Sequence, residues 1–298
     1  MLRKTLKVFA FGAASLAAAG SAWAVPTPGG IDFQTPVTET AKRVHAFHNE
    51  VLWIITVIVA VVTALLIWVM FRYRRSANPT PKKFSHNTVV EIVWTVVPVL
   101  ILVWIAKGSF PLLYEQDVAF NGEQVAEADV VDIKVYGNMW YWDYTYNQNT
   151  DNEFVVESRM LKAGDPDRPL VPARGDLEQL STDNPMVVPI NRFVRLKITA
   201  RDVIHAWAMP QFTLKVDAVP GRLNQLWFNV PVAGIYYGQC SELCGKDHSN
   251  MPIELWALPQ AQYDAWLAAA QADPANGGRK YLYSLPRPGA TTQVASAQ

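Results

Sequence analysis

The stretch VLWIITVIVAVVTALLIWVMF, residues 51–71, decides the general plan of the chain. It contains no charged side chain, and at about 1.5 Å rise per residue a helix of this length spans roughly the 30 Å hydrocarbon core of a bilayer. A second apolar run, VVEIVWTVVPVLILVWIA, occupies residues 89–106, and apolar residues resume after Lys107 as far as Tyr114. The sequence therefore predicts two transmembrane helices, at residues 51–71 and 89–114.

The loop between these two runs indicates their orientation. Residues 72–88, RYRRSANPTPKKFSHNT, carry five basic residues and no acidic one. Short loops rich in Lys and Arg stay in the cytoplasm, so residues 25–50 and the segment after residue 115 are expected on the external or periplasmic face. The composition, half hydrophobic and only 17% charged, agrees with a chain that lies partly in lipid.

The N-terminus has the pattern of an export signal. Arg3, Lys4 and Lys7 precede an apolar run over residues 8–19, and Ala22-Trp23-Ala24 forms an A-x-A cleavage pattern. We therefore expect residues 1–24 to be a cleaved signal peptide and the mature chain to begin near Val25. A retained membrane anchor is the alternative, although the apolar run is short for a membrane span.

The external segment, residues 115–258, is expected to be a β domain. Short β-branched and aromatic runs separated by Gly, Pro, Asn and Asp are typical of an antiparallel sandwich or barrel. The eight runs are residues 130–137, 139–146, 186–190, 193–200, 213–219, 225–230, 235–239 and 252–258. Residues 259–298 are expected to form a helix, at 260–272, and a tail. The predicted fold class is a membrane-anchored all-β protein.

The charge of the external part differs from that of the whole chain. From Glu115 to Gln298 there are 22 acidic residues against 15 Lys and Arg, a net charge of −7, whereas the whole chain is balanced. An acidic domain is ordinarily just well solvated. A functional interpretation is electrostatic steering of a basic partner.

The only two cysteines lie in GQCSELCGKDHSNMP, residues 238–252. Cys240, Cys244 and His248 are spaced by four, but the surrounding Gly, Ser, Asn and Pro residues oppose a helix and favour a tight loop between two strands. Met251 follows His248 closely. Thiolate, thioether and imidazole are donors that suit copper. In an exported protein a simple disulfide is the ordinary alternative.

A metal site on such a loop usually takes a further ligand from elsewhere in the sheet. His205, in DVIHAWAMP, is the only other histidine of the external domain. An isolated histidine beside a strand is more often packed or solvated, but its position fits the separated ligands of copper-binding β-sandwiches. A mononuclear blue-copper site uses one Cys, two His and a weak axial Met. The second Cys therefore predicts a binuclear copper centre with bridging sulfurs.

At these residues the sequence resembles subunit II of the haem-copper cytochrome c oxidases, over nearly the whole mature chain. The matching stretches are HNTVVEIVWTVVPVLIL, WYW, DVIHAW, DAVPGR, LWF and GQCSELCGKDHSNMP. The resemblance implies a cupredoxin-like domain of Greek-key β-sandwich or barrel type that holds a binuclear CuA centre. Its implied ligands are Cys240 and Cys244 as bridges, His205 and His248 as terminal imidazoles, and Met251 and the carbonyl of Glu242 as weak axial ligands.

The resemblance also implies roles outside the copper centre. Trp140 would receive the electron from cytochrome c, although an aromatic run is ordinarily core packing. The Glu242 carboxylate would reach a Mg or Mn ion at the boundary with subunit I, although alone it would be an ordinary loop acid. Glu91 would be the entrance of the K proton pathway, although an acid there also fits the headgroup level.

The resemblance further implies a docking surface for basic cytochrome c. The acids that match it are Asp202, Asp183 and Glu157. Thr145 stands at a position that is often Glu in the family, and residues 137–139, Gly-Asn-Met, replace the Gly-His-Gln of many members. We expect the docking electrostatics to be weaker or redistributed in this chain.

The expected function is that of the electron-accepting subunit of a proton-pumping cytochrome-c oxidase. Electrons would pass from cytochrome c through CuA to haem in subunit I, where O₂ is reduced to water. Expected partners are subunit I with haem a and CuB, subunit III, cytochrome c and membrane lipid, with no nucleic acid. The expected location is the bacterial inner membrane, with the N-terminus and the CuA domain in the periplasm.

Four alternatives differ in specific features. A quinol oxidase subunit II lacks the copper cysteines, and a nitrous oxide reductase lacks this membrane hairpin. A thiol–disulfide protein or copper chaperone could use C-x3-C but would require neither Met251 nor a second histidine. A purely structural assembly subunit would tolerate loss of both thiols.

Overall fold

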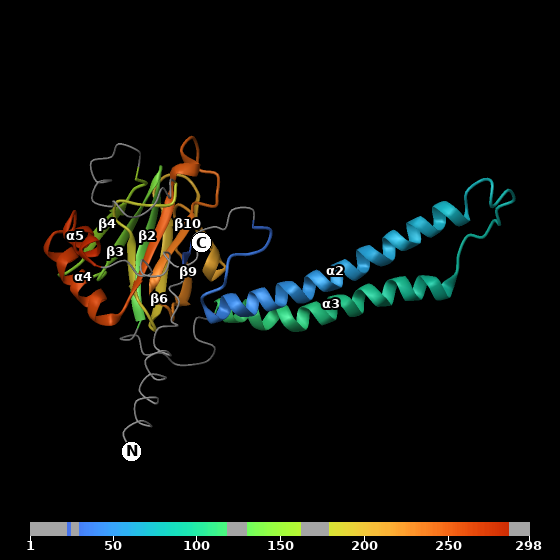
Figure 1. Cartoon of the computed structure of the whole chain (residues 1–298), viewed down its shortest axis with the longest axis horizontal. Helices are drawn as coiled ribbons and strands as arrows, with labels where there is room; N and C mark the ends of the chain where they lie inside the picture. Colours follow the sequence, from blue (N-terminus) through green and yellow to red (C-terminus); the bar gives the residue numbers. More distant parts are fainter. Residues whose placement is uncertain (1–22, 25–29, 118–129, 162–178, 286–298) are drawn as a thin grey trace, which may run out of the picture. The chain divides into compact units, whose positions relative to one another are not determined.

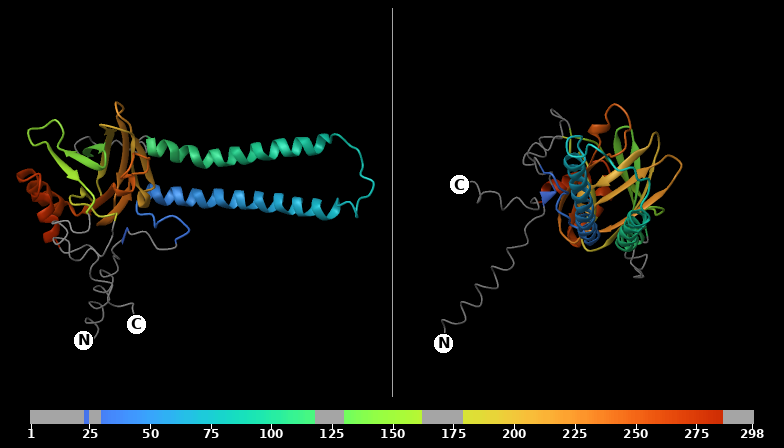
Figure 2. Two further views of the ribbon diagram at one scale, coloured as in Figure 1. Left: turned by 90° about the horizontal axis from the view of Figure 1, so that it is seen from above. Right: turned by 90° about the vertical axis from the view of Figure 1, so that its right-hand side faces the viewer.

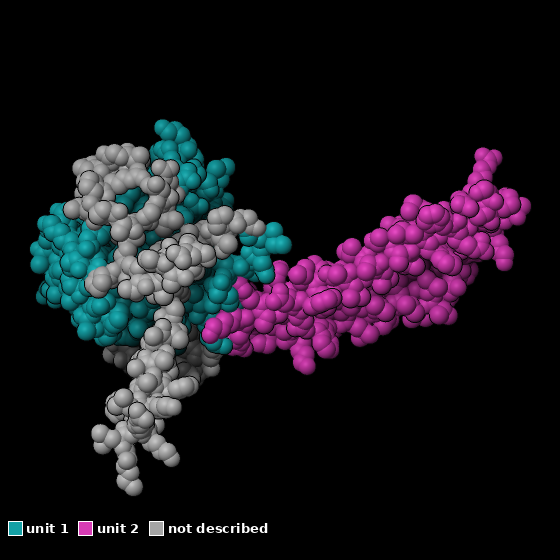
Figure 3. All heavy atoms as spheres, in the orientation of Figure 1, with its two compact units in different colours: residues 1–41, 122–298 teal, residues 42–121 magenta. Residues whose placement is uncertain are grey.

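The computed structural model describes residues 23–24, 30–117, 130–161 and 179–285 (Figure 1). The chain divides into two compact units, drawn in different colours in Figure 3. The helical unit is residues 42–121, and the β unit is residues 1–41 together with 122–298. Most of the predicted signal peptide and the predicted C-terminal tail, at residues 1–22 and 286–298, lie outside the described residues.

The helical unit is a hairpin of two long helices, α2 (Glu39–Arg72) and α3 (Thr88–Asp117). They run side by side in opposite directions (Figure 2). Both are apolar and long enough to cross a membrane, and their large apolar side chains are mostly exposed. Exposed apolar side chains along a whole helix are suited to lipid as the solvent. The two predicted spans are therefore confirmed as helices.

Both helices extend beyond the predicted spans. Polar contacts involve the extended parts of the hairpin: Arg43 forms an ion pair with Glu115 at 2.6 Å, and Glu50 Oε1 accepts a hydrogen bond from Trp104 Nε1, within the second predicted span, at 2.5 Å. The apolar window in the sequence marks only the part of a helix that lipid can cover. The polar turns of α2 that precede residue 51 were therefore not predicted.

The β unit is a sandwich of two sheets with an additional two-stranded ribbon (Figure 1). One sheet has the order β4-β3-β2-β6-β9, the other has the order β1-β10-β11-β5, and the ribbon is β7-β8. The strands are β1 (Trp23–Ala24), β2 (Val130–Asn138), β3 (Tyr141–Tyr146), β4 (Phe154–Ser158), β5 (Met186–Pro189), β6 (Phe193–Ala200), β7 (His205–Met209), β8 (Leu214–Ala218), β9 (Asn224–Asn229), β10 (Gly234–Gln239) and β11 (Pro252–Leu258).

Side chains from both sheets form one continuous core. In β6 buried residues alternate with partly exposed ones, as expected for a strand that has one face on the core. In β7 and β11 every residue is buried, because both faces are covered. Trp142, Trp207 and Trp256 are among the largest fully buried side chains. The predicted cupredoxin-like sandwich is therefore present.

The strand pairing is more mixed than predicted. Most pairs are antiparallel, but β2 pairs with β6 in parallel and β11 pairs with β5 in parallel. Each of the eight predicted runs contains or overlaps a strand, whereas β1, β4 and β7 were not predicted. The short β7, HAWAM, contains two alanines, which are depleted in strands. The strand that begins at His205 was therefore missed.

Two helices follow the sandwich. The predicted helix is present as α4 (Gln260–Ala272), whose Trp266 packs edge-on to Tyr146 at a ring distance of 5.0 Å. A second helix, α5 (Gly277–Ser284), was not predicted, because its two leading glycines oppose a helix. Here Gly278 permits close packing, since a Cβ at this position would lie 2.8 Å from Trp266 Nε1.

The strand β1 bears on the predicted signal peptide. Trp23 and Ala24 pair in parallel with Ile235 and Tyr236 of β10. Cleavage before Val25 would remove this two-residue strand, so that β10 would become the edge of its sheet. The cleavage position itself stays a prediction.

Candidate metal centre

The loop between β10 and β11 carries the two cysteines, as predicted. Cys240 follows β10 directly, and Met251 precedes β11. The two ends of the loop are tied together, because Cys240 N donates to the carbonyl oxygen of Met251 at 3.0 Å. Ser241 N donates to the carbonyl oxygen of Ala206 in β7 at 3.0 Å. The loop is therefore held against the ribbon as well as between two strands.

The two thiols are close together but not bonded. Cys240 Sγ lies 3.8 Å from Cys244 Sγ, whereas a disulfide requires about 2.05 Å. Both cysteines are free and buried, with exposed fractions of 5% and 4%. The disulfide that was the ordinary alternative is therefore not formed, and both sulfur atoms are available as metal ligands.

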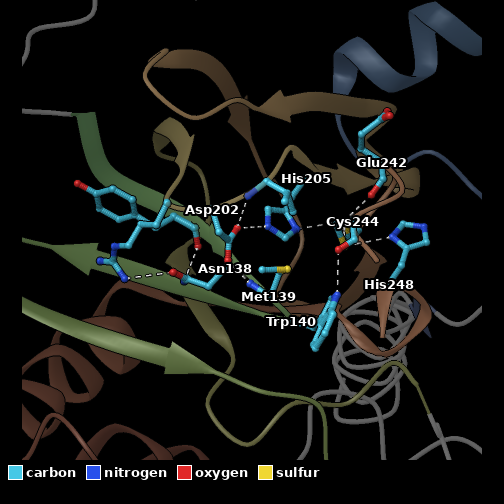
Figure 4. A network of polar contacts seen from close by, with 12 residues as sticks. Asn138, Met139, Trp140, Asp202, His205, Glu242, Cys244 and His248 are labelled. Atoms are coloured by element: carbon cyan, nitrogen blue, oxygen red, sulfur yellow. Dashed lines mark hydrogen bonds and ion pairs between the residues drawn. The ribbon is translucent and has the colours of Figure 1, made fainter. Parts of the chain in front are cut away.

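Each sulfur has its own imidazole neighbour. His205 Nδ1 lies 4.0 Å from Cys240 Sγ, and His248 Nδ1 lies 3.5 Å from Cys244 Sγ. Figure 4 shows the two imidazoles on opposite sides of Cys244. The ligand atoms of His205, Cys240 and Cys244 all lie within 4.8 Å of one another. The structure therefore gathers residues from β7 and from the loop, as the sequence predicted.

Two further oxygen or sulfur donors flank this group. The carbonyl oxygen of Glu242 lies 3.3 Å from Cys240 Sγ. Met251 is 1% exposed and directly follows the short 3₁₀ helix His248–Asn250. The Glu242 side chain is 44% exposed, with Oε2 at 3.9 Å from Lys215 Nζ. Glu242 thus offers its carbonyl to the sulfur group while its carboxylate lies toward Lys215.

This donor set fits copper. Two buried thiols, two imidazoles, a thioether and a carbonyl are soft or borderline donors with one hard oxygen. Sulfur atoms 3.8 Å apart can both contact the same pair of ions, which a single-copper site with one cysteine does not require. The residues present therefore fit a binuclear centre better than a mononuclear one.

The two thiols differ in acidity. Burial raises the pKa of Cys240, but its hydrogen bond with His205 and bonds to the backbone outweigh burial and lower it to about 7. Burial and the charge of Cys240 raise the pKa of Cys244 to about 12. Cys240 is therefore the more acidic thiol of the pair. Added positive charge nearby, which a metal ion supplies, favours the loss of both protons.

His205 is held in a fixed orientation. Its Nε2 lies 2.8 Å from Asp202 Oδ1, which leaves Nδ1 toward the sulfur of Cys240. Met139 N donates to Asp202 Oδ2 at 2.6 Å and fixes the carboxylate in turn. Gly137 leaves room for the ring, because a Cβ there would lie 2.7 Å from His205 Cδ2. Such a carboxylate–histidine pair sets the tautomer of a metal ligand.

Trp140 lies directly beside the cysteine loop. Its Nε1 donates to the carbonyl oxygen of Cys244 at 3.1 Å, as Figure 4 shows. Gly245 has φ of +115°, and a Cβ at this position would lie 3.3 Å from the Trp140 ring. The indole is partly buried in the turn between β2 and β3, rather than in a strand as the sequence suggested.

The predicted docking acids have internal partners. Glu157 Oε1 lies 2.5 Å from Arg159 Nε. Asp183 Oδ1 accepts hydrogen bonds from Arg159 N and Asn184 N, both at 2.7 Å. Burial raises the pKa of Asp183 to about 6. Sequence reasoning missed Arg159, and it also missed that Asp202 supports His205, although the three-residue spacing of Asp202 and His205 was visible.

Glu91 lies in the helical unit, where it takes part in a helix cap. Glu91 Oε1 accepts a hydrogen bond from Asn87 N at 3.1 Å, while Asn87 Oδ1 accepts from Val89 N and Val90 N. This reciprocal arrangement satisfies backbone groups at the start of α3. The carboxylate that is predicted to carry protons therefore also caps the start of helix α3.

Membrane-crossing helices joined to a β-sandwich, with thiol and imidazole donors on one loop, define a membrane-anchored cupredoxin-type redox protein. Comparison with known proteins agrees. Residues 131–258 match the family "Cytochrome C oxidase subunit II, periplasmic domain", and residues 26–112 match the corresponding transmembrane domain. The chain belongs to the family of cytochrome c oxidase subunit II.

Relatives cover most of the chain. The probable cytochrome c oxidase subunit 2 of Rickettsia bellii is 43% identical over 257 residues, 86% of this chain and 90% of that one. Cytochrome c oxidase subunit 2 of Cereibacter sphaeroides is 40% identical over 302 residues, covering 94% and 95%. The solved periplasmic domain of subunit II from Bradyrhizobium japonicum is 42% identical, covers 48% of this chain and 94% of that one, and has a TM-score of 0.41.

The family membership confirms the resemblance in the sequence. The chain is a component of a haem-copper terminal oxidase, and in this family subunit II is the electron-accepting copper subunit. It is also membrane-anchored, with two helices of sufficient length and a matching transmembrane domain. The alternatives of a thiol–disulfide protein, a copper chaperone and a purely structural subunit are not supported.

Proposed function

We propose that six residues of this chain bind a binuclear CuA centre that accepts electrons from cytochrome c and delivers them to haem in subunit I. They are His205, Cys240, Glu242, Cys244, His248 and Met251. The observation that carries the proposal is the pair of buried free sulfurs 3.8 Å apart, each with an imidazole nitrogen at 4.0 Å or less.

The protein contributes a rigid frame for electron transfer. Bound copper supplies the one-electron redox couple. The hydrogen bond from Cys240 N to the Met251 carbonyl closes the loop, and the hydrogen bond between the Asp202 carboxylate and His205 Nε2 fixes the orientation of the imidazole. Ligands that are fixed before and after electron transfer need little rearrangement, which lowers the barrier to the transfer. The stiffness of β7, β10 and β11 is therefore part of the mechanism.

Trp140 is the proposed point at which the electron enters. Its indole is partly exposed, and its Nε1 is hydrogen-bonded to the carbonyl of Cys244 at 3.1 Å. A partly exposed aromatic ring that is hydrogen-bonded to a proposed ligand residue gives the electron a short route from a docked donor to the metal centre. The acids Asp202, Asp183 and Glu157 are proposed to contribute to docking of basic cytochrome c, together with the net negative charge of the external domain.

Two further roles are proposed for single carboxylates. The partly exposed Glu242 carboxylate is proposed to bind a Mg or Mn ion shared with subunit I, a role suited to a hard oxygen donor. Glu91, at the start of α3, is proposed as the entrance of the K proton pathway. Replacement of Glu91 should slow proton-coupled turnover while leaving the reduction of copper intact.

The proposed setting is the inner membrane of a bacterium. The basic loop 72–88 is expected in the cytoplasm, and the N-terminus and the β unit in the periplasm. Subunit I, with haem a and CuB, and subunit III are the proposed membrane partners. The mature chain is proposed to begin near Val25, after removal of the signal peptide.

Replacement of one bridging sulfur tests this function in the purified oxidase. Cys244→Ser keeps the size of the side chain but removes a soft ligand, so copper bound by this chain and the rate of cytochrome c oxidation should both fall by at least about 100-fold. Ser241→Ala is the matched control, since its hydroxyl donates to the Gln239 carbonyl at 3.2 Å and is not one of the proposed ligands. Undiminished cytochrome c oxidation in Cys244→Ser would contradict the proposal.

A further inference from the structure

Arg159 brings a fixed positive charge to the region of the proposed docking surface. It follows β4, and its Nε lies 2.5 Å from Glu157 Oε1. The guanidinium carbon lies 3.7 Å from the centre of the Tyr141 ring, in a cation–π contact. Tyr141 directly follows Trp140 in the chain. The charge of Arg159 is therefore placed beside the ring of Tyr141, the chain neighbour of the residue where the electron is proposed to enter.

The backbone of Arg159 is also anchored. Arg159 N donates to Asp183 Oδ1 at 2.7 Å, and Asp183 N donates to the Arg159 carbonyl at 2.9 Å. Tyr283 of α5 donates its hydroxyl to the Asp183 carbonyl at 3.2 Å. A long surface side chain usually moves among many rotamers, which weakens its electrostatic effect. Here both the backbone and the guanidinium are held, so the charge stays in one place.

The three proposed docking acids consequently differ in the charge they offer to a donor. Glu157 is half exposed but is matched by Arg159, whose side chain is 49% exposed. Asp183 turns its Oδ1 toward backbone amides. Asp202 is engaged with His205 and Met139 N. Of the three proposed docking acids, Glu157 is therefore the exposed one whose charge is directly cancelled by a neighbouring positive charge, that of Arg159.

We propose that Arg159 is a specificity-determining residue that neutralises Glu157 and so weakens the attraction of a basic cytochrome c to the surface around Trp140. This inference rests on the proposed function. Without Arg159, Glu157 would present an unmatched negative charge to the lysine-rich face of such a donor. Without Glu157, Arg159 would repel the same donor. The two residues therefore have opposite effects on the same association step.

The test uses the purified oxidase and soluble basic cytochrome c, with kcat/KM measured from low to physiological salt. Arg159→Gln should raise kcat/KM at low salt by about two- to fourfold and steepen its fall with added salt. Glu157→Gln should lower kcat/KM by a similar factor. The double variant should return close to the wild type. Turnover at saturating cytochrome c should change little, because only association is affected.

Arg192→Gln is the matched charge control. Arg192 precedes β6, so it lies about 26 Å from the Ala200 end of that strand, where β6 pairs with Gly137 of β2. The Arg192→Gln substitution removes one positive charge, as Arg159→Gln does, but far from Trp140. It should therefore change kcat/KM by much less than Arg159→Gln.

Three outcomes would overturn the proposal: no effect of Arg159→Gln, an equal effect of the control Arg192→Gln and of Arg159→Gln, or slower association in Arg159→Gln. Slower association would mean that Arg159 itself contacts an acidic group of the donor. Failure of the proposed function is distinguishable, because the wild-type oxidase would then not oxidise cytochrome c at any salt concentration. An unchanged copper spectrum in each variant verifies that the metal centre is intact.

Discussion

Gly245 is the residue on which the approach of Trp140 to the cysteine loop depends. Its φ of +115° disfavours any side chain, and a Cβ would lie 3.3 Å from the indole. Gly245→Ala should therefore displace Trp140 from the Cys244 carbonyl and slow electron transfer from cytochrome c by about tenfold or more. Stopped-flow reduction of the copper centre by cytochrome c measures this rate.

Gly221→Ala separates backbone strain from displacement of the indole. Gly221 has φ of +77°, but within the described residues no atom beyond its own chain neighbours lies within 4 Å of its would-be Cβ. Its replacement should cost about 1–2 kcal/mol of stability and leave the transfer rate unchanged. Equal rates in both variants would show that the position of Trp140 does not limit electron transfer.

Asp183 makes the stability of the β unit depend on pH. Its pKa is raised to about 6 by burial, so the folded state holds the proton between about pH 4 and 6 while the unfolded state releases it. Stability from this group is therefore present below pH 4 and is lost as pH rises to 6. The difference amounts to at most about 3 kcal/mol.

Denaturant unfolding of the separately expressed segment 122–298, the larger part of the β unit, measures this dependence. Asp183→Asn keeps an oxygen that can accept from both Arg159 N and Asn184 N but cannot ionise. It should lose less stability than the wild type between pH 4 and 6. Parallel pH curves for the two proteins would refute the assignment.

At the residue scale, ligand chemistry was predictable and the surroundings were not. Cys240, Cys244 and His248 were visible together, because soft donors on one short loop point to a metal. The pairing of Asp202 with His205 and of Glu157 with Arg159 depends on side-chain directions across turns and strands, which spacing alone does not give. Charges therefore looked more available for docking in the sequence than they are in the structure.

At the element scale, α5 offers a direct test of packing. Gly278 faces α4, where its would-be Cβ lies 2.8 Å from Trp266 Nε1 and 3.1 Å from Ala270 Cβ. Gly278→Ala improves helix propensity but should push the two helices apart, with a net loss of about 1–3 kcal/mol in stability. Thermal unfolding followed by tryptophan fluorescence measures the change.

Lys280→Ala is the control on the same helix, since Lys280 is 72% exposed and pairs only loosely with Asp273 at 3.8 Å. It should change stability by less than about 0.5 kcal/mol. A Gly278→Ala variant as stable as the Lys280→Ala variant would mean that contact with Trp266 does not hold α5 in place.

Elements with strong patterns were predicted, and those fixed by tertiary contacts were not. The spans within α2 and α3 follow from apolar length, and strands such as β6 follow from alternation. The helix α5 and the strand β7 carry weak local signals and exist through their contacts with α4 and β8. Elements with a strong local propensity were therefore predicted, and elements without one, such as α5 and β7, were missed.

At the scale of the whole molecule, the sequence predicted the order of parts better than their pairing. A membrane hairpin followed by a β-sandwich follows from hydropathy and strand spacing. The parallel pairing of β2 with β6 and of β11 with β5 joins strands distant in the chain, and local patterns carry no information on such partners. The β10–β11 pairing nevertheless places a loop at one end of a sheet, where ligands from β7 can reach it.

The central claim is that this loop and His205 hold two copper ions as one redox unit. Electron spin resonance of the oxidised, purified oxidase tests it most directly, together with copper analysis and with Cys244→Ser as the reference. A binuclear centre should give the hyperfine pattern of one unpaired electron shared equally by two copper nuclei, and this pattern should be absent in Cys244→Ser. An electron confined to a single copper nucleus, or an oxidised dithiol without copper, would contradict it.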